Sequence, residues 1–195
     1  MRILGDLASG NCLKVKYAAD RLGLAYEWTD VDILKGESRT PEFLAVNPMG
    51  QVPAVILDDG RALAQSNAIL QYLAEGTDLL PGDAYDRAKV AEWLFWEQYS
   101  HEPYIGVCRF HMVYRGQPKE TRENWRVERG DAALDAMDQA LTDRAYLVGT
   151  GLTIADIGLL AYTRLAGQGG FDLAARPAVT AWIGRCEIAL GLDPV

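Results

Sequence analysis

The chain has 195 residues, of which 49% are hydrophobic and 24% are charged, so it can bury a core in one domain or two small ones. Its formal net charge is −8, which produces a field unfavourable to the phosphates of nucleic acids. No run approaches the roughly 20 apolar residues that cross a bilayer, and the first residues lead directly into a strand pattern rather than a signal peptide. We therefore expect a cytoplasmic protein that binds neither nucleic acid nor membrane.

The cysteines and histidines indicate neither disulfides nor a metal site. Cys12, Cys108 and Cys186 are widely spaced and odd in number, a pattern that favours free, reduced thiols. His101 and His111 have no accompanying cysteine or carboxylate at the spacing of metal ligands. We expect three free thiols and no metal.

The chain opens with a strand, helix, strand pattern. Residues 2–5 form a short apolar run, and residues 11–23 place apolar side chains at helical spacing before they end at a glycine. Residues 25–31 are typical of a second strand, which a right-handed crossover would pair parallel to the first. This order predicts a βαβ unit.

A hairpin and a helix are predicted next. Residues 54–57 and 61–64 flank Asp58-Asp59-Gly60, where an Asp-Gly pair supplies the positive φ angles of a tight hairpin turn. Residues 66–74 place apolar side chains on one helical face. With an irregular link before the hairpin, the order of elements matches a thioredoxin-like arrangement.

The remainder of the chain predicts a linker and an all-helical domain. Residues 76–84 contain glycine and proline among acidic residues and mark the linker. The expected helices are 85–114 with a kink at Pro103, 119–141, and 177–190. Between the last two, Thr153 and Asp156 have the spacing of a capping box at a helix N-terminus. Four tryptophans are expected in the core rather than in a pocket: Trp93, Trp96, Trp125 and Trp182.

Ser9 lies between the first strand and the first helix, where a thioredoxin-like unit carries the leading cysteine of a redox pair. With Cys12 as the only thiol there, a two-cysteine couple is impossible. Lowering the pKa of a bound thiol by about 2 takes roughly 2.7 kcal/mol, and one hydrogen bond of about 1.5 to 3 kcal/mol plus a helix terminus of about 0.3 to 1 kcal/mol supplies it. The alternative is that Ser9 only caps the helix.

Two further elements suit a peptide ligand. A cis bond before Pro53 would leave the backbone of Val52 free to pair with an extended peptide, the alternative being an ordinary turn proline. Ser66 is expected at an N-cap, where its hydroxyl and nearby amides hold a carboxylate while Gln65 meets an ammonium or amide, the alternative being capping alone. With Ser9, these elements jointly favour a peptide site.

Three motifs carry a resemblance to a known family: Asn47-Pro48-Met49-Gly50-Gln51-Val52-Pro53, Gln65-Ser66-Asn67-Ala68-Ile69 and Thr153-Ile154-Ala155-Asp156. They resemble motifs of cytosolic glutathione S-transferases of a bacterial, serine-loop, zeta-like or theta-like type, and the likeness covers nearly the whole chain. The resemblance implies a thioredoxin-like domain over residues 1–75 that binds glutathione and an all-helical domain over residues 85–195 that shapes the electrophile pocket. It also implies a cytoplasmic homodimer that conjugates glutathione to small hydrophobic electrophiles, a detoxification chemistry.

The resemblance also assigns roles to individual residues. Ser9 matches the position that stabilises the glutathione thiolate, and Asn11 is a residue that shares or replaces that role. The implied glutathione contacts are Lys35 (with Arg39 as the alternative), Gln51, Val52, Pro53, Gln65 and Ser66. The implied electrophile pocket contains Tyr104, Cys108 and His111. Cys12 is expected in the core, and the capping box is expected to serve stability.

Other functions of the same fold stay open at the level of sequence. Glutathione-dependent reduction of disulfides or peroxides and glutathione-assisted isomerisation use the same thiol site. A non-catalytic dimerisation or partner-binding module is the rival from another class. The polar set Ser9, Gln65 and Ser66 argues against that rival, because a module without catalysis has no use for it.

Overall fold

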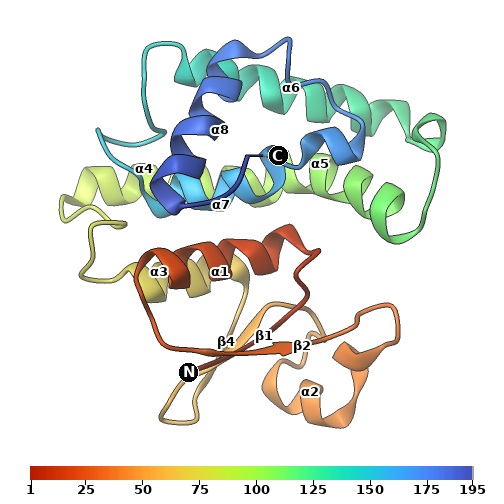
Figure 1. Ribbon diagram of the computed structural model, residues 1–195, viewed down its shortest axis with the longest axis vertical. Helices are drawn as coiled ribbons and strands as arrows, with labels where there is room; N and C mark the ends of the chain where they lie inside the picture. Colours follow the sequence, from red (N-terminus) through yellow and green to blue (C-terminus); the bar gives the residue numbers. More distant parts are fainter. Residues whose placement is uncertain (195) are drawn as a thin grey trace. The chain divides into compact units, whose positions relative to one another are not determined.

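The computed structural model describes residues 1–194. The chain forms two compact units, one of residues Met1–Glu75 and one that begins at Gly76 (Figure 1). Across residues 1–194, no helix combines the length and the apolar character that a membrane span needs.

The first unit is a four-stranded sheet with helices on both of its faces. Its elements are β1 (Arg2–Gly5), α1 (Gly10–Arg21), β2 (Glu27–Asp30), a 3-10 turn (Glu37–Arg39), α2 (Pro41–Val46), β3 (Ala54–Ile56), β4 (Ala62–Ala64) and α3 (Ser66–Ala74). The strand order is β2-β1-β3-β4, with β1 parallel to β2 and the other neighbours antiparallel. The expected βαβ unit, hairpin and thioredoxin-like order are confirmed.

Each face of the sheet has its own core, because successive residues of a strand point to opposite sides. Ile3 of β1 packs with Val15 of α1 and Ile69 of α3. Leu4, the next residue, packs on the other face with Phe43 of α2. Figure 1 shows α1 and α3 together on one side of the sheet and α2 on the other.

Helix α2 lies in the link that the sequence analysis left irregular. It has six residues, less than two turns, which is too short for a helical period to appear in the sequence. Its start is locally encoded, because the Thr40 hydroxyl accepts a hydrogen bond from the Phe43 amide at 3.3 Å and Pro41 follows the cap.

Within its described residues, the regular elements of the second unit are all helical, as expected. Its elements are α4 (Ala84–Trp96), a π-helical turn (Glu97–His101), α5 (Glu102–Arg109), a second π-helical turn (Phe110–Tyr114), a 3-10 turn (Lys119–Thr121), α6 (Asn124–Leu141), α7 (Ile154–Thr163), a 3-10 turn (Ala166–Gly169) and α8 (Pro177–Leu190). Every residue of α7 is buried, so this helix forms the centre of the unit.

Two expected helices differ in detail. The tract expected over residues 85–114 is divided by π-helical turns, and Pro103 lies in the first turn of α5, where a missing N–H breaks no helical hydrogen bond. The helix expected from residue 119 begins at Asn124 instead, because Arg122 and Glu123 have extended backbones.

The capping box and the three free, buried cysteines are confirmed. Trp182 is fully buried, whereas Trp125 is 47% exposed, so the expectation that all four tryptophans lie in the core is wrong. Trp125 instead packs edge-on against Tyr104, with ring centroids 6.2 Å apart.

Candidate functional site

Ser9 and Cys12 contact each other at the start of α1. Ser9 occupies the N-cap position, but its side chain accepts no capping hydrogen bond. Its hydroxyl instead forms a hydrogen bond with the Cys12 thiol, which also accepts from the Asp6 backbone N–H at 3.3 Å. Burial raises the pKa of Cys12 to about 11, outweighing both hydrogen bonds. The interpretation of Ser9 as a simple cap is therefore wrong, and the expectation that Cys12 lies in the core is confirmed.

The N-terminus of α3 lacks a side-chain cap. Gln65, rather than Ser66, occupies the N-cap position, and its side chain makes no capping hydrogen bond. Among residues 1–194, Gln65 is the only non-glycine residue with a positive φ, at 69°. Such a backbone conformation costs about 1 to 3 kcal/mol and is concentrated at functional sites. The first amides of α3 are thus left without the side-chain oxygen that usually caps them.

A hydrogen bond joins the starts of α1 and α3. The Ser66 hydroxyl donates to Asn11 Oδ1 at 3.0 Å, across 55 positions in the sequence. Ser66 is buried and Asn11 is half-buried. A second link lies one turn farther along, where Lys14 Nζ is 3.5 Å from Asn67 Oδ1. Asn11, assigned to the thiolate position, and Ser66, assigned to the glutathione contacts, are therefore direct neighbours.

Val52 presents an unpaired backbone edge before β3. The peptide bond between Val52 and Pro53 is cis. Within residues 1–194, neither the N–H nor the C=O of Val52 takes part in a hydrogen bond. A free donor and acceptor beside a strand end can pair with an extended peptide in the manner of an added strand.

Asn47 builds the turn that carries Val52. Its side-chain oxygen accepts from the Met49 amide at 3.1 Å, and its side-chain nitrogen donates to the Gln51 carbonyl at 2.7 Å. Gly50 is required in this turn, because its φ is +62° and an added Cβ would lie 2.9 Å from the Ser38 carbonyl oxygen. The sequence analysis named the motif but gave Asn47 no role, although an Asn-Pro pair before a glycine is a turn signal.

Within residues 1–194, no hydrogen bond or ion pair joins the side chain of Lys35 or Gln51 to another candidate residue. The Lys35 side chain is 75% exposed, and its ammonium lies 2.9 Å from the Asp32 carboxylate, which raises the pKa of Lys35. Gln51 is also exposed, and the hydrogen bond at this residue involves its backbone carbonyl. Arg39, the alternative to Lys35, donates to the Met49 carbonyl at 3.1 Å.

Of the three expected electrophile-pocket residues, the structure brings two together. Cys108 and His111 line one cavity of about 120 Å³ in the second unit, together with Arg122 and Arg126. Burial raises the pKa of Cys108, while the charges of the two arginines lower it. Tyr104 does not line this cavity, and its hydroxyl accepts from Arg129 Nη1 at 3.1 Å.

Two family models match the chain. "Glutathione S-transferase, N-terminal domain" matches residues 8–75, and "Glutathione S-transferase, C-terminal domain" matches residues 95–188. Together they cover most of both units described above.

Individual relatives are similar over nearly their whole length. The chain is 34% identical to glutathione S-transferase 3 of Zea mays, over 93% of this chain and 86% of the relative. It is 35% identical to a maleylacetoacetate isomerase of Rhizobium meliloti, over 92% of this chain and 86% of the relative. The crystal structure of a glutathione S-transferase from Pseudomonas fluorescens is 49% identical, with a TM-score of 0.92 over 95% of this chain and 94% of that one.

Proposed function

The chain belongs to the glutathione S-transferase family and is a glutathione transferase with glutathione as its substrate. We propose that it conjugates the glutathione thiol to small hydrophobic electrophiles. The observation that carries the proposal is the hydrogen bond between Ser66 and Asn11, which couples the starts of α1 and α3. In the proposed arrangement, the first unit holds glutathione and the second unit shapes the electrophile pocket.

The start of α1 supplies the donors that stabilise the thiolate. The Ser66 hydroxyl occupies the oxygen of the Asn11 amide, and within residues 1–194 the amide nitrogen donates to no other group. Asn11 therefore keeps a free N–H donor beside the helix terminus, whereas the Ser9 hydroxyl already meets the Cys12 thiol. In this proposal Asn11 and Ser9 both face the glutathione sulfur, and Asn11 is the donor without a competing partner.

The remaining candidates bind the peptide parts of glutathione. The free N–H and C=O of Val52 pair with the cysteinyl backbone, beside Gln51 and Pro53. The uncapped start of α3, with Gln65 and Ser66, receives the γ-glutamyl carboxylate and ammonium. Lys35 would meet the glycyl carboxylate by exchanging its Asp32 partner for another anion.

The second substrate is proposed to contact Tyr104, Cys108 and His111. The cavity beside Cys108 and His111 supports this part of the proposal, because it offers a small volume next to an unpartnered ring nitrogen of His111 within the described residues. The Cys108 thiol is expected to pack against the electrophile rather than to attack it, because burial keeps it protonated.

The experiment is a thermal melt with glutathione, combined with calorimetry and an activity panel of an aryl halide, a disulfide, a hydroperoxide and a maleyl compound. A ligand present at 100 times its Kd should stabilise the binding unit by about 2.7 kcal/mol. S-methylglutathione is the matched ligand, because it keeps the peptide and lacks the ionisable thiol. Absence of both stabilisation and turnover would remove the proposal, and turnover of the maleyl compound alone would redirect it to isomerisation.

A cytoplasmic homodimer completes the proposal. Phe95 and Tyr99 are 74% and 81% exposed and lie one turn apart, so they form an apolar face that a second copy can cover. Sedimentation of the purified chain should give a dimer, and Phe95→Glu should shift it toward the monomer. A monomer at all concentrations would contradict this part of the proposal.

A further inference from the structure

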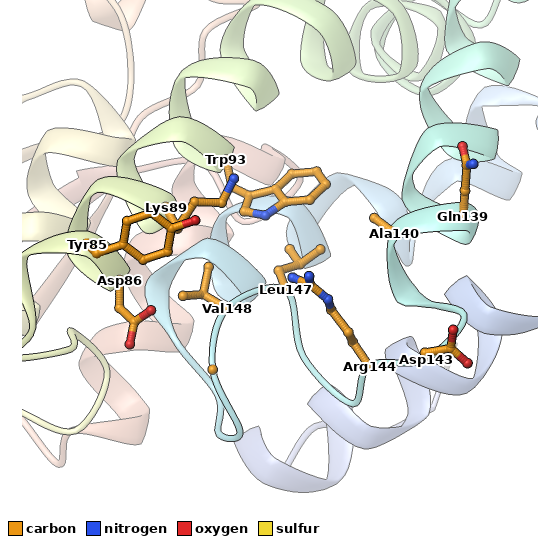
Figure 2. A pocket seen from close by; sticks show the side chains of 11 residues that line it. Tyr85, Asp86, Lys89, Trp93, Gln139, Ala140, Asp143, Arg144, Leu147 and Val148 are labelled. Carbon is orange, nitrogen blue, oxygen red and sulfur yellow. The ribbon is translucent and has the colours of Figure 1, made fainter.

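Two concave sites of the second unit differ in size and in charge. The larger has a volume of about 460 Å³, and its lining carries charges of both signs, including Asp143 and Arg144 (Figure 2). None of the candidate glutathione or electrophile residues lines it. The smaller has a volume of about 120 Å³ and is lined by Cys108 and His111, two of the candidate electrophile residues. We call it the Cys108 cavity, and it is the one of the two that bears on the second substrate.

The charges at the Cys108 cavity do not balance. Its lining includes Arg122, Glu123 and Arg126. The Glu123 carboxylate accepts hydrogen bonds from Arg126 Nε at 3.1 Å and from Arg126 Nη2 at 2.8 Å, so these two charges compensate each other. Arg122 forms no ion pair with any residue in 1–194. One positive charge is therefore left over at the cavity, in a chain whose formal net charge is −8.

Neutral groups hold the Arg122 guanidinium in place. Its Nε donates to the Lys119 carbonyl at 3.0 Å, and its Nη1 donates to the Gly169 carbonyl at 3.0 Å. Its Cζ lies 5.4 Å from the centroid of the Phe171 ring. A Cβ added at Gly170, whose φ is +79°, would lie 3.0 Å from the same Cζ, so the glycine lets the guanidinium lie against the backbone. The cation is thus positioned before any ligand arrives, which lowers the entropic cost of binding.

Arg122 and His111 both keep polar atoms for a ligand. Within the described residues, Nη2 of Arg122 takes part in no hydrogen bond, and Nδ1 of His111 is buried without a partner. A guanidinium presents its donors in a planar fork that matches the two oxygens of a carboxylate. Burial raises the pKa of the Cys108 thiol and the charge of Arg122 lowers it in part, so the guanidinium acts on the inside of the cavity.

The size of the cavity indicates which part of a ligand it takes. Sites for complete small molecules occupy about 300 to 1,000 Å³, whereas a cavity of about 150 Å³ holds benzene. The Cys108 cavity, at about 120 Å³, is suited to the charged end of a molecule whose apolar body extends out of it. A neutral apolar end would desolvate the guanidinium without giving it a partner, whereas a carboxylate supplies both a hydrogen-bond acceptor and the opposite charge.

We propose that the second substrate is an electrophile with a carboxylate group, and that Arg122 binds this carboxylate beside His111. Arg122, which the sequence analysis did not identify, is then a residue that determines substrate specificity. The inference rests on the proposed function, because it names the class of second substrate for the same site. With an aryl halide, the glutathione sulfur forms a bond to the ring carbon, chloride leaves with its bonding electrons, and the thiol proton passes to solvent.

The test compares two aryl halides of the same shape that differ in charge, 4-chloro-3-nitrobenzoate and 4-chloro-3-nitrobenzamide. The measured quantity is kcat/KM divided by the rate constant of the uncatalysed reaction with glutathione, which removes the difference in intrinsic reactivity. We expect this quantity to be about tenfold or more higher for the acid than for the amide, the effect of a hydrogen bond between charged groups.

Substitutions at Arg122 identify the source of that preference. Arg122→Met should lower the value for the acid about 10- to 100-fold, mainly through KM, and should change the value for the amide less than about twofold. Arg122→Lys keeps the charge but loses the fork, so the preference for the acid should fall without vanishing. The ratio of acid to amide is measured on one protein, so a loss of folded enzyme does not change it. Arg115→Met removes an exposed arginine outside the cavity, and as the matched control it should leave the ratio unchanged.

The outcomes separate this inference from the proposed function. Equal turnover of acid and amide by the wild type, or absence of acid turnover in a protein that glutathione stabilises, would overturn the inference alone. So would a ratio that Arg122→Met leaves unchanged or that Arg115→Met lowers equally, because the preference would then come from another cation or from the overall charge of the protein. Absence of both glutathione stabilisation and turnover would remove the proposed function, and this inference with it.

Discussion

The start of α3 and the start of α7 are both helix N-termini, yet their free amides are treated in opposite ways. At α7, Thr153 and Asp156 form a reciprocal capping box, and both residues are buried. At α3, Gln65 offers no cap, and the Ser66 hydroxyl is directed to Asn11 on another helix. One helix start is saturated by its own side chains, whereas the other is left open.

In the proposed function, the free amides of a helix start serve stability in one unit and ligand binding in the other. The Asp156 carboxylate accepts hydrogen bonds from the Thr153 amide and hydroxyl, the Leu147 amide and the Trp182 indole. No acceptor capacity remains there for a ligand. The start of α3 has unfilled donors and a strained N-cap residue, which a bound anion can relieve.

The comparison is tested most severely at Asp156. Asp156→Asn keeps the shape, but its NH₂ group would face the N–H donors of Leu147 and Trp182 in one orientation and the Thr153 amide in the other. We expect the second unit to lose about 3 kcal/mol of stability, which corresponds to a fall in melting temperature of roughly 6 to 12 °C. Thermal unfolding followed by circular dichroism measures it, with Thr153→Ser as the conservative control. A change within about 2 °C would show that the box is not what holds α7.

The opposite response is expected at Asn11. Asn11→Ala should lower kcat/KM about 100-fold, the usual effect of losing a donor to a developing anion. It should lower the melting temperature less than Asp156→Asn does, because it leaves only the buried Ser66 hydroxyl without its acceptor. Ultraviolet titration of the bound thiol should show a raised pKa. Ser66→Ala should have a smaller effect that is not additive with Asn11→Ala, because Ser66 acts on the thiol through Asn11. Full activity in Asn11→Ala would leave Ser9 or the backbone amides as the donors.

The two helix starts also differ in how much the sequence reveals. The capping box is encoded within four residues, so a local pattern was enough to predict it. The contact between Asn11 and Ser66 joins residues 55 positions apart, and only the packing of α1 on α3 creates it. The N-cap at α3 was predicted one residue too late, because composition gives no signal for a glutamine with a positive φ. The parallel pairing of β1 with β2 and the hairpin of β3 and β4 were predictable from strand patterns, whereas the six-residue α2 was too short to show a period.

The start of α1 is a third helix N-terminus, and its effect can be measured from the pH dependence of stability. Cys12 lies in its first turn, but burial raises the pKa of this thiol to about 11. A raised pKa in the folded state gives stability that is complete below the unfolded value, about 8.5, and is lost as pH rises toward 11. Wild type should therefore lose roughly 3 kcal/mol more than Cys12→Ala between pH 8 and 11. If the free energies of unfolding of wild type and Cys12→Ala changed in parallel with pH, the helix terminus rather than burial would determine the pKa of this thiol.

The smallest expected effect is at Gln65, where two substitutions distinguish the strain of the backbone from the contribution of the side chain to glutathione binding. Gln65→Gly removes the side chain and makes φ 69° acceptable, whereas Gln65→Ala removes the side chain and keeps the strain. Both variants should bind glutathione about tenfold more weakly, because both lose a hydrogen bond to a charged group. The glycine variant should nevertheless be about 1 kcal/mol more stable than the alanine variant, since relief of the strained backbone exceeds the added entropy of the unfolded chain. Calorimetry and urea unfolding read the two effects separately. If the alanine variant were the more stable one, the positive φ of residue 65 would not be a strain that destabilises the start of α3.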